Sequence, residues 1–163
     1  MSGFDMGTFL AGLTDTVTPG RGRPLVVHAA DMQPLPIGEV HNPSALSVAG
    51  DLPTATFELF RQTIPPGGSS DMQRHHHETV HMVLAGDGRS EIEDDEVTWT
   101  TGSLVYTPPW TWHRHWNDSA DQPVEFLTIE NSRLLGLLGV NRRQSAGLVD
   151  IAEARARFGG DPT

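Results

Sequence analysis

The sequence predicts an all-β fold, a sandwich or jelly-roll barrel followed by short helices. Short runs of alternating residues, rich in β-branched and aromatic side chains, recur along the middle of the chain. Gly- and Pro-bearing turns separate these runs, as in antiparallel sheets. Six of the 8 histidines fall in two clusters with strand-like spacing. The clusters are far apart in sequence, so they can form one site only if two strands meet.

The N-terminal third is predicted to carry little regular structure. Residues 1–24 read as a short helix or arm that ends in the turn at Pro19 and Gly20. The apolar run 25–28 follows, and prolines then interrupt the chain up to Pro53, which predicts loops. We expect one domain, with an arm and first strands over 1–53, a barrel core over 54–131 and a helical tail over 132–163.

The barrel core accounts for most of the predicted strands. They are expected at 54–64, 74–85 (one strand or two), 90–93, 97–100, 104–106 and 124–130, with a further strand at the second histidine cluster after Pro108 and Pro109. The acidic run 91–96 is expected to be an exposed hairpin. Two helices are predicted in the tail, one over 132–138. The other, over 150–158, has Asp150 as N-cap, Glu153 three residues later and glycine at its end.

Composition excludes several function classes. The chain has no cysteine, so any metal is bound by nitrogen and oxygen ligands. A net charge of -10 argues against nucleic acid or an anionic membrane surface as partner. No apolar run approaches the roughly 20 residues that span a bilayer, and no signal peptide is recognised at the start, so we expect a cytoplasmic protein.

The histidine clusters predict a metal site. Residues i and i+2 of a strand face the same side, so His75 is expected to share a face with His77, and His113 with His115. If these faces meet inside a small barrel, several imidazoles converge on one ion. Imidazole binds iron, manganese, cobalt, nickel, copper and zinc, so the ligand type does not select among them.

Two stretches of the core resemble the conserved motifs of the cupin superfamily. The second motif is matched at Gly102, Pro108, His113 and Asn117, with Trp110 where the general pattern has glycine. The stretch 108–117 is similar to the corresponding part of gentisate 1,2-dioxygenase-like cupins. The ending of the first motif is matched over 83–88, and the resemblance covers roughly 54–131.

The resemblance leaves two registers open for the first motif. An ungapped count back from Gly86 puts the family's acidic position at Thr79 and its two histidine positions at Gln73 and His75. Sliding the loop by two residues restores the histidine pair as His75 and His77. We favour His75, His77 and His113 as metal ligands, with His81 as the fourth candidate and Gln73 in place of His77 as the alternative.

Other residues receive roles around this centre. His115 is implied to bond substrate or metal-bound water, and it is the candidate acid or base. Trp110, Trp112 and Arg61 are candidate pocket residues with Gln73, although aromatic side chains equally serve as core or dimer contacts. Arg114, like Arg61, would bind a substrate carboxylate or form a surface ion pair. His28, His41 and His76 are expected to be structural or surface residues.

The resemblance implies a mononuclear Fe(II) dioxygenase that combines O₂ with a small aromatic diol or hydroxy acid. Zinc, nickel, manganese or copper are the other metals considered. The alternatives are a metal-dependent isomerase, lyase or cyclase that uses Lewis-acid catalysis, and a non-catalytic cupin that binds a small molecule. A homodimer is expected because sheet edges of this kind can be covered by pairing.

Overall fold

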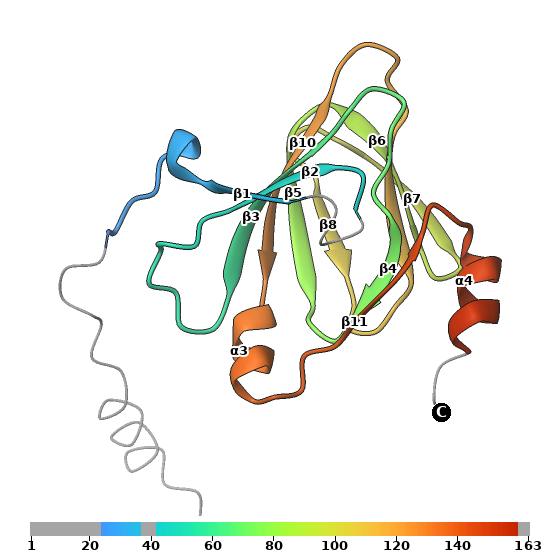
Figure 1. Ribbon diagram of the computed structural model, residues 1–163. Helices are drawn as coiled ribbons and strands as arrows, with labels where there is room; N and C mark the ends of the chain where they lie inside the picture. The colour runs from blue at the N-terminus through green and yellow to red at the C-terminus, as the bar shows by residue number, and fades with distance from the viewer. Residues whose placement is uncertain (1–23, 37–41, 160–163) are drawn as a thin grey trace, which may run out of the picture.

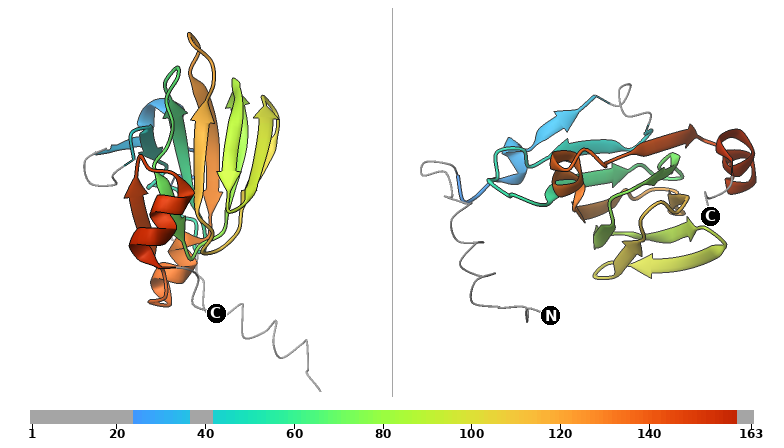
Figure 2. Two further views of the ribbon diagram at one scale, coloured as in Figure 1. Left: turned by 90° about the vertical axis from the view of Figure 1, so that its right-hand side faces the viewer. Right: turned by 90° about the horizontal axis from the view of Figure 1, so that it is seen from below.

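Alternating buried and exposed side chains build two antiparallel sheets that face each other (Figures 1 and 2). The structure, a computed structural model, describes residues 24–36 and 42–159. The strands are β1 (Gln33–Leu35), β2 (Ala45–Val48), β3 (Glu58–Ile64), β4 (Met72–His75), β5 (Thr79–Ala85), β6 (Asp87–Ile92), β7 (Asp95–Thr100), β8 (Leu104–Thr107), β9 (His113–Asn117), β10 (Val124–Glu130) and β11 (Arg143–Gly147). One sheet has the order β1-β2-β3-β10-β5-β8 and the other the order β11-β4-β9-β6-β7. The predicted all-β fold is confirmed.

The predicted strands of the core are confirmed, whereas the first strands expected within 1–53 were predicted without bounds and β11 was not predicted. The region 74–85 forms two strands, β4 and β5, and β10 has the predicted bounds. The bounds of β1 were not predicted because it contains Pro34, which is tolerated where a strand lies at the edge of its sheet. The bounds of β2 and the existence of β11 were not predicted because neither has a regular apolar alternation.

Some N-terminal predictions cannot be compared with the structure. The helix or arm within 1–23, the turn at Pro19 and Gly20, and His41 lie outside the described residues. Residues 25–28 form no strand, and a single 3-10 turn, η1 (Ala29–Asp31), follows them. The division into three segments stays a prediction.

The barrel interior is apolar in one part and lined with histidine in another. Ile64, Val83, Trp99, Val105, Val124 and Phe126 form a buried cluster between the two sheets. Phe126 makes ring contacts with His81 and His115, with centroids 5.5 and 5.6 Å apart. The apolar cluster therefore packs directly against the histidines, and its rigidity fixes where their rings lie.

Both helices of the tail are confirmed. α3 (Ser132–Leu137) follows β10, and α4 (Ile151–Phe158) follows β11 (Figure 1). The Asp150 side chain accepts from the backbone N–H of Glu153 at 2.8 Å, as an N-cap does. Ala154 of α4 is buried with Met72 and Trp112, so α4 covers the outer side of the five-stranded sheet.

The turn between β6 and β7 is tied to α4 through Glu93. Its carboxylate accepts from the backbone N–H of Trp112 at 2.5 Å and forms an ion pair with Arg155 of α4, also at 2.5 Å. Arg155 bonds Asp94 as well, at 2.9 Å. The expected acidic hairpin is present, and part of its charge is matched by the helix.

The outer face of β5 and β8 exposes large apolar side chains. Met82, Leu84, Leu104 and Tyr106 all lie there, and Leu104 is 69% exposed. The expected homodimer stays a prediction. Among the described residues, no helix is both long enough and apolar enough to cross a bilayer.

Gly88 lies where two parts of the barrel approach too closely for a side chain. A Cβ at this position would come within 2.2 Å of the Trp116 carbonyl oxygen and 2.6 Å of the Trp99 ring. We expect Gly88→Ala to lower the free energy of unfolding by at least about 2 kcal/mol, because backbone must move. Chemical denaturation of the wild type and the variant measures this difference in the free energy of unfolding.

Gly136→Ala is the matched control. Gly136 is exposed in α3, and nothing lies within 4 Å of its added Cβ. Alanine there is expected to change stability by less than about 1 kcal/mol, in the stabilising direction. Equal effects of the two substitutions would contradict the close-approach argument.

Candidate metal centre

Five imidazoles from three segments meet between the sheets. His75 ends β4, His77 lies in the bend after it, His81 is on β5, and His113 and His115 are on β9. All five residues are buried. Ring centroids are 4.7 Å apart for His75 and His113, 4.5 Å for His81 and His115, and 5.7 Å for His113 and His115. The two sequence clusters therefore do converge on one place.

Strand alternation explains the arrangement on β9. His113, His115 and Asn117 are buried, whereas Arg114 and Trp116 between them are only partly buried. Arg114 bonds Ser69 Oγ at 2.7 Å on the other side of the strand and stacks on Trp116 at 4.9 Å. The face shared by His113 and His115 is as predicted, and Arg114 points away from it.

On β4 the strand geometry agrees with the ungapped register. Gln73 and His75 line the cavity, and Thr79 lines it from the start of β5. β4 ends at His75, so the expectation that His75 and His77 share one strand face is wrong. His77 still reaches the cavity from the bend, and its ring stacks on that of His75 at 3.6 Å.

Hydrogen bonds hold most of these rings at Nδ1. His75 Nδ1 donates to the His77 carbonyl at 2.7 Å, and His113 Nδ1 donates to the Thr111 carbonyl at 2.9 Å. A carbonyl only accepts, so both rings carry their hydrogen on Nδ1 and leave the Nε2 lone pair available. His81 Nδ1 contacts Thr128 Oγ1 at 2.9 Å, and His115 Nδ1 contacts Ser90 Oγ at 2.7 Å.

The opposite nitrogens fit a metal. Within the described part of the chain, the buried Nε2 atoms of His81, His113 and His115 have no hydrogen-bond partner. Buried polar atoms rarely lack a hydrogen-bond partner. A neutral imidazole nitrogen is a common transition-metal donor when the other ring nitrogen forms a hydrogen bond. The donor set therefore suits a divalent metal.

His77 is engaged differently. Its Nε2 lies 3.2 Å from Glu130 Oε2, and its Nδ1 contacts Asn141 Oδ1 at 3.1 Å. Burial alone would raise the pKa of Glu130, but the His77 hydrogen bond and charge outweigh it and lower that pKa. With both ring nitrogens in use, His77 would have to break a contact to bind an ion.

Burial keeps the other imidazoles neutral. Desolvation, reinforced by neighbouring imidazoles, lowers the pKa of His75 to about 2 and that of His81 and His113 to about 3. It also lowers the pKa of His115 well below its ordinary value. Neutral imidazole is the form that binds metal.

The described side chains are not oriented to bind a single ion together. Across residues 24–36 and 42–159, no three His, Asp or Glu side chains stand where a single metal could contact all of them. For His75 and His77 the stacking is one reason, because two parallel stacked rings cannot both point a nitrogen lone pair at the same atom. Binding would require these side chains to rotate.

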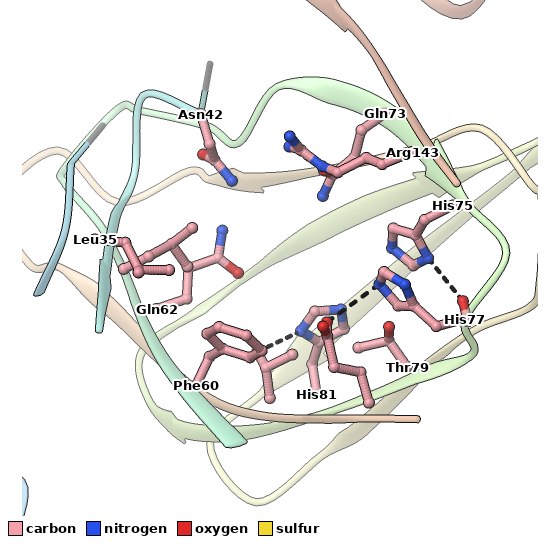
Figure 3. A pocket seen from close by; sticks show the side chains of 13 residues that line it. Leu35, Asn42, Phe60, Gln62, Gln73, His75, His77, Thr79, His81 and Arg143 are labelled. Carbon is pink, nitrogen blue, oxygen red and sulfur yellow. Dashed lines mark hydrogen bonds and ion pairs between the residues drawn. The ribbon is translucent and has the colours of Figure 1, made fainter. Parts of the chain in front are cut away.

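A cavity of about 190 Å³ opens beside the histidines (Figure 3). Leu35, Leu46 and Phe60 form its apolar wall. The polar lining residues are Asn42, Gln62, Gln73, His75, His77, Thr79, His81, Thr128, Glu130 and Arg143. His113 and His115 are not among the lining residues and lie against the rings of His75 and His81.

Three predicted pocket residues do not reach this cavity. Arg61 is on β3, where its Nη2 pairs with Glu125 Oε2 at 2.5 Å outside the barrel. Trp110 and Trp112 sandwich the Arg74 guanidinium, at 4.5 and 4.7 Å. Both tryptophans therefore pack against a cation, Trp112 also belongs to the buried cluster under α4, and only Gln73 of the four predicted pocket residues lines the cavity.

The sequence reasoning also missed three residues of the site. Thr128 and Glu130 continue the inward alternation of β10 from Val124 and Phe126, a signal that was available. Arg143 carried no such signal, because β11 was not predicted. Of the remaining histidines, His28 is exposed and His76 Nδ1 donates to the Val140 carbonyl at 2.6 Å, so neither lies at the centre.

The buried imidazoles predict acid sensitivity of the metal-free protein. Unfolded histidine takes up a proton below about pH 6.5, whereas the folded rings resist until about pH 3. The unfolded state therefore binds more protons in this window, and stability falls as pH falls from 6.5. Each ring contributes up to about 1.4 kcal/mol per pH unit.

Chelator-treated protein denatured between pH 8 and 5.5 measures this slope. His115→Gln should reduce this slope by the contribution of one proton, up to about 1.4 kcal/mol per pH unit. A slope that His115→Gln does not alter would contradict the account.

Comparisons with known proteins agree with this architecture. Residues 60–130 match the family model described as a cupin domain. Gentisate 1,2 dioxygenase 1 of Aquipseudomonas alcaligenes is 38% identical over 67 residues, 40% of this chain and 19% of that protein. The 1-hydroxy-2-naphthoate 1,2-dioxygenase of Nocardioides sp. (strain KP7) is 26% identical over 107 residues, 66% of this chain and 28% of that protein. The matches thus span less than a third of either relative.

Solved structures share the fold. The crystal structure of a cupin-2 domain protein from Rhodospirillum rubrum has a TM-score of 0.61 and 24% sequence identity, covering 82% of this chain and 87% of that one. The matching segment includes all the strands that carry the histidines. Residues 60–130 match the cupin-domain model, the fold is that of a cupin-type β-barrel, and the chain resembles gentisate 1,2-dioxygenase-like cupins.

Proposed function

We propose that this protein is a mononuclear metal-dependent cupin enzyme, an Fe(II) dioxygenase acting on a small aromatic diol or hydroxy acid. The observation that carries the proposal is the set of buried, neutral imidazoles of His81, His113 and His115, whose Nε2 atoms have no partner among the described residues, beside a cavity with one apolar wall. The similarity of this chain to proteins named as dioxygenases supports the reaction class. A bound Fe(II) would supply the redox chemistry between the substrate and O₂.

The proposed metal ligands are His75, His81, His113 and His77. The Nδ1 bonds of His75 and His113 favour these two, because they leave Nε2 to bind. The unpartnered Nε2 of His81 favours it as the third ligand. His77 is the least favoured of the four proposed ligands, because its Nε2 already pairs with the Glu130 carboxylate.

The chain's own residues define the rest of the chemistry. Ser90 Oγ accepts from Trp99 Nε1 at 2.8 Å and contacts His115 Nδ1, so this hydroxyl orients the His115 ring. His115 is proposed as the acid or base, through the Nε2 that no described residue bonds. The apolar wall of Leu35 and Phe60 would hold an aromatic ring and exclude water.

Cavity size favours a single-ring substrate. An apolar cavity of about 150 Å³ in another protein holds benzene. The cavity here measures about 190 Å³, which leaves room for one ring with small substituents. Fused-ring compounds would need the lining to move.

Metal analysis of untagged protein with oxygen-uptake assays tests the proposal. We expect about one equivalent of iron, with uptake of O₂ when small aromatic diols and hydroxy acids are added. His113→Ala and His81→Ala should each lose most of the iron, because each removes a proposed donor. The exposed residue His28 provides the control, and the His28→Ala variant should keep the bound iron.

Other outcomes point elsewhere. Retention of iron in His113→Ala would contradict the assignment of this centre. Zinc or nickel without oxygen uptake would favour the Lewis-acid isomerase, lyase or cyclase. Absence of metal after anaerobic reconstitution with Fe(II) would favour the alternative of a non-catalytic cupin that binds a small molecule.

A further inference from the structure

We propose that the outer face of the six-stranded sheet is a docking surface for residues 6–17 of the same chain, which would lie across it as a short amphipathic helix. This face is on the outside of the barrel, and nothing in it depends on the proposed metal centre. Its chemistry is set by the apolar side chains that β5, β8 and β10 direct away from the interior.

Strand pairing aligns these side chains in two rows across the sheet. Because residues alternate between the two faces of a strand, every second residue of β3, β5, β8 and β10 points outward. The pairing registers place Tyr106, Val80, Ile129 and Leu59 in one row and Leu104, Met82, Leu127 and Arg61 in the other. Arg61 pairs with Glu125 on the neighbouring strand, so its charge is already matched. The two rows therefore form one continuous and largely apolar surface.

The solvated face of an antiparallel sheet normally carries polar side chains, and this face does not. Leu104 and Tyr106 are 69% and 49% exposed, so no segment among the described residues packs over them. The five-stranded sheet shows how the same chain treats an apolar outer surface, because α4 covers it at Met72 and Trp112. A second terminal helix on the six-stranded sheet would complete the same arrangement.

The size of the surface favours a helix over a second copy of the protein. The rows cross four strands that lie about 4.8 Å apart, which with Leu84 gives a patch of about 300 to 400 Å². A stable protein–protein interface buries about 800 Å² on each partner, so this patch alone is too small to hold a second copy. A helix of 12 residues is about 18 Å long and about 10 Å wide, which matches the width of the four strands.

The sequence that precedes the described residues carries a matching apolar surface. Five apolar residues recur there at helical spacing, with glycine, alanine, threonine and aspartate between them: Met6, Phe9, Leu10, Leu13 and Val17. The described chain begins at Pro24, which lies on the outer side of the six-stranded sheet (Figure 2). Residues 18–23 can span up to about 20 Å, so the apolar segment can reach this face.

Reactivity of a single introduced thiol tests the docking. The chain has no cysteine, so Met82→Cys places one reactive group in the middle of the rows. We expect this thiol in the full chain to react with a maleimide at least about tenfold more slowly than in the same chain carrying Phe9→Asp and Leu13→Asp, because two carboxylates on the apolar side prevent docking. Ile129→Cys is the second probe if Met82→Cys does not fold.

Matched controls separate docking from other effects. Thr8→Asp with Ala11→Asp adds the same two charges on the opposite side of the predicted helix and should leave the protection unchanged. Thr100→Cys, at an exposed position of β7, should react at one rate in all these backgrounds. Protection should also persist on about hundredfold dilution, because the tether keeps the segment at millimolar effective concentration.

Several results would overturn the inference. Equal reactivity of Met82→Cys with and without the Phe9→Asp and Leu13→Asp changes would show that the segment does not cover the face. Protection that survives these changes would assign the face to another occupant, and its loss on dilution would identify a second copy. Protection that these changes abolish but that weakens on dilution would overturn docking within one chain. Loss of protection in the Thr8→Asp and Ala11→Asp control would attribute the effect to charge in general.

Discussion

Burial of several uncharged imidazoles inside one small barrel is the constraint on which the rest of this structure depends. A charged ring at these positions would lie beside other rings in a region closed to water, which is costly. The protein meets this constraint with hydrogen bonds at Nδ1, which His75 and His113 donate to backbone carbonyls and which His81 and His115 share with hydroxyl groups. Each bond holds one ring nitrogen and leaves Nε2 outside that bond, and among the described residues the rings would still have to rotate before three of them could contact one ion.

The apolar cluster and the histidine layer form one packed unit. Phe126 contacts the ring of His81 edge-on and that of His115 at a tilt, and its ring centroid lies 4.9 Å from that of Trp99. Trp99 in turn donates to Ser90, which contacts His115. A change in the core therefore reaches the candidate centre through two or three contacts. A side chain at Gly88 would press on the Trp99 ring, which is part of this series of contacts.

Local patterns predicted most of the fold and less of the site. Alternation placed β5, β9 and β10, and the capping signal at Asp150 placed α4, because both depend on residues that are neighbours in sequence. The end of β4 at His75 was beyond such reasoning, since it is set by the bend and by pairing with β9 and β11. The same limit applies to Trp110 and Trp112, whose partner is Arg74 on a neighbouring strand. Arg143 depends on a strand pairing across some 70 residues, which no local pattern contains.

The contacts of Glu93 with Trp112 and Arg155 affect whether the segment that matches the cupin model could be moved into another protein. The segment recognisable as cupin ends at residue 130, yet Glu93 joins the backbone of Trp112, next to a candidate ligand, to Arg155 in the last helix. β11 likewise covers β4 and supplies part of the cavity. The autonomous folding unit is therefore larger than the recognisable motif, and grafting the motif segment alone into another scaffold would leave the histidine strands without their outer support.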